Sequence, residues 1–173
     1  MERQEPVIIR RIRPEEYDAA GELIVQAYRT LGDVGDEFYE QQLRDVGGRV
    51  AGGEVLVAEI GGRLVGSVTF IDGKAALSEV DDPDAGTIRM LGVSTNARGR
   101  GVGEALVAAC VDHAVKSGRR RVRLDTRTSM KSAQRLYERL GFRRDAEHDW
   151  SPAPGILLLG YVLDLDDTLN TTS

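Results

Sequence analysis

A run of arginines and glycines in the middle of the chain combines residue types that could bind phosphate. The run reads Arg98-Gly99-Arg100-Gly101-Val102-Gly103. Glycine lacks the Cβ atom that would hold a ligand away from the backbone, and the first N–H groups of a helix have no partner inside the helix. Arginine adds charge-assisted hydrogen bonds to phosphate oxygens. The spacing therefore predicts a phosphate-binding turn if a helix begins here.

The segments on either side of this run must hold it in place. Residues 88–93 form a short apolar run that favours a strand, and it ends at the turn-forming residues 94–96. From Val102 to Lys116, apolar residues recur at helical spacing and leave only a narrow polar stripe. The sequence thus predicts a strand, a glycine-rich turn and a helix that is covered on most sides.

Two common phosphate-binding patterns do not fit the run. The P-loop requires Gly-Lys followed by Ser or Thr, and no such sequence occurs here. The dinucleotide pattern G-x-G-x-x-G fails because Glu104 or Leu106 stands where the third glycine belongs. What remains is R-x-x-G-x-G after a strand. The alternative interpretation is a tight turn whose arginines only aid solubility.

A second patterned segment, residues 129–142, predicts a helix that ends at Gly141, because its apolar residues fall at i, i+3, i+4 and i+7. Both segments resemble motifs of the GNAT superfamily of N-acetyltransferases. R-x-x-G-x-G resembles the family's pyrophosphate-binding turn. The segment that closely resembles its A-x-x-L-Y-E-K-L-G-F signature is Ala133-Gln134-Arg135-Leu136-Tyr137-Glu138-Arg139-Leu140-Gly141-Phe142.

The resemblance implies an α/β (α+β) fold, with a mixed, mostly antiparallel central sheet flanked by helices. It also implies acetyl-CoA as co-substrate and direct transfer of the acetyl group to an amine acceptor, either a small molecule or a peptide. Tyr137 would be the general acid that protonates the CoA thiolate. The residues that would bind the cofactor, together with Tyr137, are Leu91, Gly92, Val93, Arg98, Gly99, Arg100, Gly101, Val102, Gly103 and Ser132.

Two positions depart from the family pattern. Many members carry Asn three residues before the alanine of the helix signature, where this chain has Met130. Many also carry Glu as general base in the strand before the turn, and alignment of the strand places Thr87 there. A proton acceptor must then be sought elsewhere, and His113 and His148 are weaker candidates than the acidic residues of the loop before the strand. These acidic candidates are Glu79, Asp81, Asp82 and Asp84.

Composition limits the alternatives. The length of 173 residues predicts a single domain over 1–173, with 164–173 a frayed tail. The net charge of −5 and the 5% aromatic content argue against nucleic acid as a partner. Cys110 is the only cysteine, so no cysteine-based metal cluster is expected, and no metal is predicted. We expect a cytoplasmic protein without a membrane segment, and a homodimer stays open.

Three functions stay in competition. An acetyltransferase comes first, and a catalytically silent CoA-binding domain with a sensing or interaction role is the alternative that the missing strand Glu supports. A nucleic-acid module built on arginines is the weakest of the three. Its arginines would be Arg119, Arg120 and Arg121, which we interpret as residues favoured by a helix C-terminus. Arg123 with Arg127 makes a patch that is better suited to the CoA phosphates.

Overall fold

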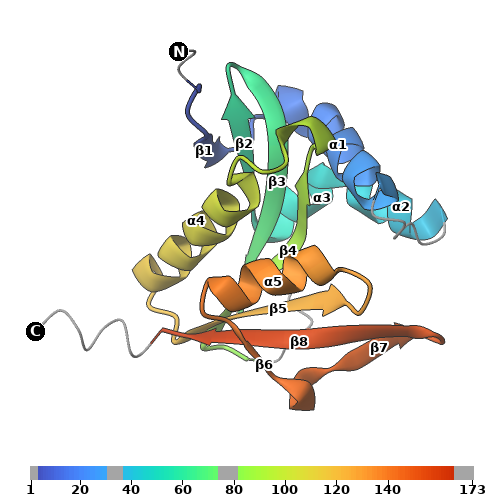
Figure 1. Ribbon diagram of the computed structural model, residues 1–173, viewed down its shortest axis with the longest axis vertical. Helices are drawn as coiled ribbons and strands as arrows, with labels where there is room; N and C mark the ends of the chain where they lie inside the picture. The colour runs from blue at the N-terminus through green and yellow to red at the C-terminus, as the bar shows by residue number, and fades with distance from the viewer. Residues whose placement is uncertain (1–3, 31–36, 74–81, 166–173) are drawn as a thin grey trace, which may run out of the picture. The chain divides into compact units, whose positions relative to one another are not determined.

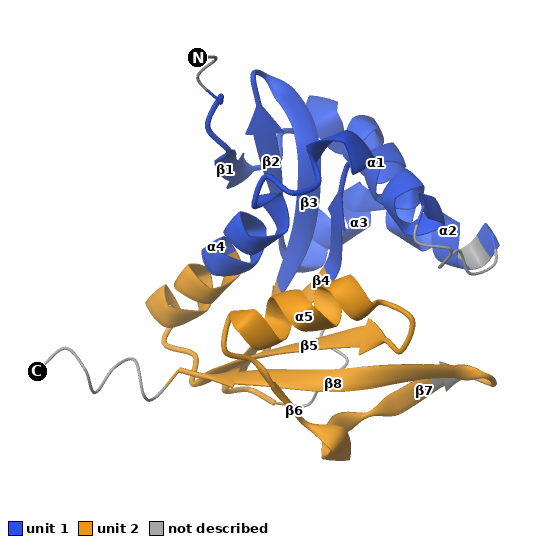
Figure 2. Ribbon diagram, in the orientation of Figure 1, with its two compact units in different colours: residues 1–70, 90–109 blue, residues 71–89, 110–173 orange. Residues whose placement is uncertain are grey.

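The computed structural model describes residues 4–30, 37–73 and 82–165 (Figure 1). The chain divides into two compact units (Figure 2): unit 1 contains residues 1–70 and 90–109, and unit 2 contains residues 71–89 and 110–173. The elements described are, in chain order, β1 (Ile8–Arg11), η1 (Pro14–Glu16), α1 (Tyr17–Thr30), α2 (Glu37–Arg44), α3 (Val46–Gly52), β2 (Glu54–Ile60), β3 (Arg63–Asp72), β4 (Ala85–Val93), η2 (Thr95–Ala97), α4 (Val102–Lys116), β5 (Arg121–Arg127), α5 (Lys131–Arg139), β6 (Arg143–Arg144), η3 (Ala146–His148), β7 (Trp150–Ala153) and β8 (Ile156–Asp164).

The strands are hydrogen-bonded in the order β1-β2-β3-β4-β5-β8-β6, and β7 also pairs with β8. Strands β4 and β5 run parallel, whereas β1/β2, β2/β3, β5/β8, β6/β8 and β7/β8 are antiparallel pairs. A mixed, mostly antiparallel sheet with helices is the fold class that the sequence predicted, and this prediction is confirmed.

In unit 1, the hairpin between β2 and β3 forms where the sequence predicted it. Ile60 pairs with Arg63, so only Gly61 and Gly62 lie in the turn. Their φ values are 58° and 79°, which is the left-handed conformation that two-residue hairpin turns require and that glycine adopts without strain.

The core of unit 1 forms where helix α1 covers the strands. Ala20 of α1 lies in one buried cluster with Val46, Val55 and Val57, and further along the helix Ile24 lies in a second. Their spacing along α1 is that of one helical face. Burial of this face fixes α1 against the sheet of unit 1.

In unit 2, β8 is the common pairing partner of β5, β6 and β7. It pairs with β5 from Arg121↔Asp164 to Arg127↔Leu158, and β6 and β7 also pair with it. Along β5, Val122, Leu124 and Thr126 are buried and alternate with half-buried charged residues. This alternation is typical of a strand with one face on the core.

Two expectations about unit 2 need correction. Strand β8 continues to Asp164, and Leu165 is buried and donates its backbone N–H to the carbonyl of Arg120 at 2.8 Å, so the frayed tail does not begin at 164. Residues 166–173 lie outside the described part. The short strands β6 and β7 were not expected, because they are defined by pairing with β8 and not by alternation in their own sequence.

None of the described helices is long and apolar enough to cross a membrane.

Candidate active site

The turn between β4 and α4, in unit 1, has the backbone conformation that its glycines make accessible. Gly99 and Gly101 have φ values of 79° and 75°. A Cβ atom at either position would meet no atom within 4 Å, so the space in front of both glycines is open. These glycines are therefore required by backbone conformation and not by crowding inside the protein.

Helix α4 begins directly after this turn. The N–H of Ala105 donates to the carbonyl of Gly101 at 3.0 Å, which is the first hydrogen bond of the helix. The N–H groups of Val102 and Gly103 come before that bond and have no partner inside the helix. The side chain of Val102 is buried, so only its backbone is available to a ligand. Backbone donors at the positive end of a helix suit an anion.

The two arginines of the turn differ in their surroundings. Arg98 is exposed and has no polar partner among the described residues. Arg100 donates from Nη2 to the backbone carbonyl of Glu5 at 3.0 Å. Arg98 therefore offers a free cation, whereas Arg100 would have to leave its contact with Glu5 to bind an anion.

Strand β4 is kinked before the segment that the sequence assigned to the cofactor. Its register with β5 runs from Ala85 to Ile88, and Met90 has φ 53°, a left-handed value that is uncommon for a non-glycine residue. Gly92 follows at a close approach to α1, since a Cβ atom there would lie 2.8 Å from Ile24 Cδ1. Gly92 therefore allows helix α1 to lie against this part of the strand.

Tyr137 lies in the core of unit 2. Its ring contacts Phe142 and Tyr161, with centroids 5.9 and 6.1 Å apart. Burial raises the pKa of the Tyr137 phenol above its ordinary value, with a smaller contribution from Cys110. The hydroxyl is therefore neutral at physiological pH, and it has no hydrogen-bond partner within the described part of the chain.

The start of α5, which carries Tyr137, lacks a capping side chain. Met130 is the N-cap residue and makes no side-chain capping hydrogen bond. Gln134 instead ties the helix to the preceding loop, because its Nε2 donates to the carbonyl of Arg127 at 3.0 Å. Ser132 is exposed and accepts a hydrogen bond from Arg135 Nη2 at 3.3 Å.

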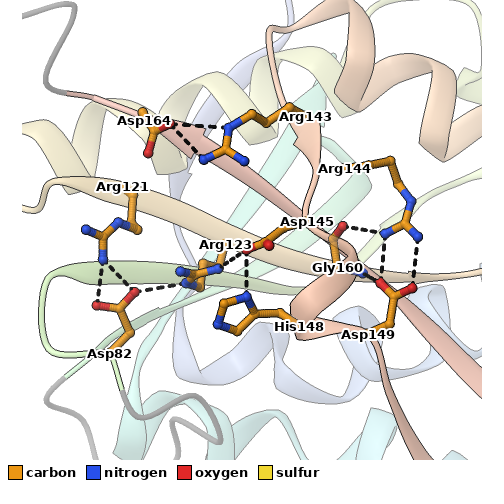
Figure 3. Close-up of polar contacts among 10 residues, drawn as sticks. All are labelled: Asp82, Arg121, Arg123, Arg143, Arg144, Asp145, His148, Asp149, Gly160 and Asp164. Atoms are coloured by element: carbon orange, nitrogen blue, oxygen red, sulfur yellow. Dashed lines mark hydrogen bonds and ion pairs between the residues drawn. The ribbon is translucent and has the colours of Figure 1, made fainter.

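Of the four acidic candidates, Glu79 and Asp81 lie outside the described residues. Asp84 is exposed, whereas Asp82 is held by two arginines (Figure 3). Arg121 Nη1 lies 2.9 Å from Asp82 Oδ2, and Arg123 Nε donates to the same oxygen at 2.9 Å. Burial alone would raise the pKa of the Asp82 carboxyl, but these hydrogen bonds outweigh it and lower the pKa below its ordinary value. Asp82 as a proton acceptor stays a prediction.

The arginines in and just before β5 are largely paired within unit 2. Besides the contacts of Arg121 and Arg123 with Asp82, Arg119 donates from Nη1 to the carbonyl of Pro83 at 2.6 Å and lies 3.3 Å from Asp72. Arg123, which we expected to form a patch for the CoA phosphates with Arg127, is therefore engaged by a carboxylate distant in sequence, and its role toward CoA stays a prediction.

These pairs make Asp82 important for stability. We expect Asp82→Asn to lower the free energy of unfolding by about 1–3 kcal/mol at pH 7, because Arg121 and Arg123 lose a charged partner. Since the folded-state pKa of Asp82 is lowered, its contribution is present above the ordinary carboxyl pKa of about 3.9 and is lost as the pH falls through the folded-state value. Urea unfolding at neutral and acidic pH measures this difference. An equal difference at both pH values contradicts the prediction.

The ion pairs continue from Arg123 to Asp145, which our site prediction did not include, and to His148, which it included only as a weaker candidate base. Arg123 Nη1 donates to Asp145 Oδ2 at 2.7 Å, and His148 Nδ1 lies 2.7 Å from the same oxygen (Figure 3). Asp145 is placed by its own backbone, whose N–H donates to the carbonyl of Gly160 in β8 at 2.9 Å. The only sequence signal was a histidine with acidic neighbours, and that signal does not reveal Arg123 as a partner.

A pocket of about 500 Å³ lies next to this group in unit 2. Its lining includes Thr87 of β4, which is buried and whose Oγ1 has no hydrogen-bond partner within the described residues. Most of the other polar groups that line it are acidic or aromatic. They include Asp125, Glu147, His148, Asp149 and Trp150.

The family model described as "Acetyltransferase (GNAT) family" matches residues 17–142, which include the turn, helix α4, Tyr137 and strands β2 to β5. The chain belongs to the GNAT family. Among curated relatives, an uncharacterized N-acetyltransferase of Methanocaldococcus jannaschii is 30% identical over 146 residues, which cover 78% of this chain and 59% of that protein. The chain spans less than two thirds of the length of the curated relatives that it matches.

Solved GNAT structures resemble this fold. A GNAT-family acetyltransferase from Staphylococcus aureus Mu50 has a TM-score of 0.75 at 17% identity, covering 93% of this chain and 100% of that chain. The structure of the Salmonella typhimurium protein yncA, with its cofactor acetyl-CoA, has a TM-score of 0.69 at 21% identity and covers 93% and 95%. At these identities the likeness shows the GNAT fold.

Proposed function

We propose that this GNAT chain transfers the acetyl group of acetyl-CoA to a primary amine by direct attack of the amine on the thioester. The observation that carries the proposal is the turn before α4, where left-handed Gly99 and Gly101 lie beside open space in a family member. Exposed backbone donors at a helix N-terminus suit the pyrophosphate of CoA. That the S. typhimurium relative was solved with acetyl-CoA supports the choice of cofactor. We also propose that the two units together form one acetyltransferase domain.

The proposed cofactor site uses mainly backbone groups. Residues 98–103 would bind the pyrophosphate, with Arg98 as the free cation. The backbone of residues 91–93, after the kink at Met90, would bind the pantetheine arm, and Ser132 would add a polar contact near the start of α5.

The chemistry requires a neutral amine. An alkylammonium ion has a pKa of about 10.4, so reaching the free amine at pH 7 costs about 4–5 kcal/mol without assistance. The free amine attacks the carbonyl carbon of the thioester, a C–N bond forms, and backbone N–H groups stabilise the negative oxygen of the tetrahedral intermediate. The C–S bond then breaks and the thiolate leaves.

Tyr137 would assist the departing thiolate. A thiol has a pKa of about 8.5, well below that of a buried phenol, so Tyr137 does not give up its proton permanently. It donates a hydrogen bond to the thiolate as charge develops on sulfur, and the proton that the nitrogen loses on forming the amide replaces the one passed to sulfur. The unused hydrogen-bonding capacity of its hydroxyl supports this role.

A catalytically silent CoA-binding domain is the second candidate, and Thr87 is the observation that favours it. The position where many relatives carry Glu has a hydroxyl that is buried and cannot act as a base at neutral pH. A silent domain would keep the cofactor turn and lose the proton acceptor.

A panel of amines incubated with acetyl-CoA separates the two candidates. We expect release of free thiol above the rate without amine for at least one class of amine, with formation of the acetylated product confirmed by mass. The panel should contain diamines, polyamines, aminoglycosides, lysine-containing peptides and peptides with a free N-terminus. Binding of CoA without acetylation of any of these amines would favour the silent domain.

A further inference from the structure

His148 is held in a defined orientation by the ion pairs of unit 2. Its Nδ1 lies 2.7 Å from Asp145 Oδ2, an oxygen that Arg123 also contacts (Figure 3). A nitrogen at this distance from a carboxylate carries the proton, so Nδ1–H donates and Nε2 keeps a free lone pair when the ring is neutral. No described residue occupies Nε2. The imidazole is therefore oriented on one side and available as a base on the other.

The burial of the three side chains fits this arrangement. Arg123 and Asp145 are 13% and 15% exposed, whereas the His148 side chain is 47% exposed. The carboxylate is thus fixed by a half-buried arginine, and the imidazole that it orients is open to solvent. Arg123 also keeps Asp145 ionised: burial would raise the pKa of the Asp145 carboxyl, but the hydrogen bond from Arg123 and the charge of His148 lower it.

The pocket beside His148 has the chemistry of a site for an organic cation. Glu147 and Asp149 lie on either side of His148 in the lining, and Asp125 accepts a hydrogen bond from Trp150 Nε1 at 2.9 Å. Carboxylates attract an ammonium ion, and the Trp150 ring offers an apolar surface for alkyl carbons.

We propose that His148, oriented by Asp145, is the proton acceptor that converts the ammonium group of the acceptor, bound in this pocket, to the free amine. The inference rests on the proposed function and names the base that the family position at Thr87 does not supply. The acceptor is a primary amine that is cationic in solution.

The protons of the reaction balance. The ammonium nitrogen gives one proton to His148 Nε2, directly or through one water, and becomes the nucleophile. After the C–N bond forms, the nitrogen loses a second proton, which balances the proton that the CoA sulfur gains when the C–S bond breaks. Imidazolium at His148 then returns its proton to solvent, because the side chain is exposed. The overall change is ammonium plus thioester to amide, thiol and one proton.

The carboxylates of the pocket are poorer bases than an imidazole. Asp149 is engaged by Arg144 at 2.7 Å and by the N–H of Gly160 at 2.8 Å. The hydrogen bond from Arg144 is the largest of the influences that lower the pKa of Asp149 to about 2. An imidazole is intrinsically a stronger base than a carboxylate. The carboxylates attract the cation, and the imidazole takes the proton.

Charged and titratable groups around His148 come from each neighbouring element. Its own segment and β6 contribute Arg144, Asp145, Glu147 and Asp149, of which Arg144 and Asp149 pair with each other. From β5, β8 and the residues before β4, the pocket receives Arg123, Asp125, Tyr161 and Asp82. Asp82 is paired with Arg121 and Arg123, and Asp145 with Arg123; the pKa of each carboxyl is lowered, so both stay ionised near neutrality.

The pH dependence of kcat/KM tests the proposal. We expect His148→Gln to lower kcat/KM for an alkyl diamine about 10- to 100-fold at pH 7. The gap should shrink as the pH approaches the pKa of the amine, because free amine then forms without a base. A merely structural effect would keep the same ratio at every pH. His113→Gln, which removes the other histidine of the chain, is the matched control and should follow the wild type.

A second measurement detects binding of an amine beside His148 without requiring catalysis. The chain has two histidines, so imidazole ¹⁵N resonances can be assigned with the two Gln variants. We expect the His148 signals to show a proton on Nδ1 and to shift when butane-1,4-diamine is added, while the His113 signals stay unchanged. Asp145→Asn should remove the preference for the Nδ1–H form.

The outcomes separate this inference from the proposed function. If the wild type acetylates amines and His148→Gln has the same rate and pH profile, His148 is not the base and the inference alone fails. If the ¹⁵N signals of the His148 imidazole do not shift when the diamine is added, the inference is also overturned. If no amine is acetylated at any pH, the proposed function fails and the inference fails with it.

Discussion

CoA should raise the thermal midpoint of the wild-type chain, and Gly101→Val should abolish that rise. A ligand that binds only the folded state stabilises it by about 2.7 kcal/mol when present at a hundred times its Kd. For a chain of this length, that free energy corresponds to about 5–10 °C. Valine at Gly101 would place a β-branched side chain in the open space before α4, at a φ of 75° that valine does not readily adopt.

Gly118→Val is the matched control for this experiment. Gly118 follows the other end of α4, has φ 74°, and has equally open surroundings. Both substitutions should therefore cost about 1–2 kcal/mol of backbone strain, and only the one at Gly101 should remove the response to CoA. Differential scanning fluorimetry with and without CoA measures both effects. An undiminished CoA shift in Gly101→Val would show that this turn does not bind the pyrophosphate.

The turn could be predicted from the sequence because its signals are local. Glycines at 99, 101 and 103 between an apolar strand and an apolar helix indicate a left-handed turn before a helix, and Gly99 and Gly101 have that conformation in the structure. The helix of residues 131–139 could be predicted for the same reason, since apolar spacing and a terminal glycine belong to one short segment. The roles of these residues toward CoA stay predictions.

The surroundings of His148 could not be predicted in this way, because they depend on pairing between distant strands. The parallel register of β4 with β5 sets Thr87 opposite Arg123, and the antiparallel register of β5 with β8 sets Arg123 opposite Val162. Asp145 then reaches Arg123 from the loop that runs along β8. No spacing within a single segment encodes these contacts, so Arg123 was interpreted as part of a phosphate patch.

The backbone conformation at Met90 in β4 is another feature that could not be predicted from the sequence. Met90 has φ 53°, although methionine has no preference for the left-handed region. The residue is instead held by tertiary packing, since it lies against the buried cluster that contains Ile24. A strand prediction from alternation alone therefore finds the strand but not its kink.

Tyr137→Phe should lower turnover by about one to three orders of magnitude while CoA still raises the thermal midpoint. Phenylalanine keeps the ring contacts with Phe142 and Tyr161 and removes only the hydroxyl that would donate to the leaving thiolate. Because that hydroxyl is neutral and makes no hydrogen bond with the described residues, its removal should change the free energy of unfolding little. A loss of rate without a loss of stability is the expected signature of a group that acts in the reaction.

The control for this experiment is Tyr28→Phe, a buried tyrosine of unit 1 with no proposed part in the reaction. Its rate of acetylation should equal that of the wild type. Steady-state kcat and KM for acetyl-CoA, measured with the best amine from the panel, distinguish a lost donor from weakened binding. A fall in kcat with unchanged KM fits a hydrogen bond made only as the C–S bond breaks. If kcat is unchanged, Tyr137 is a core residue and another group, or water, must assist the thiolate.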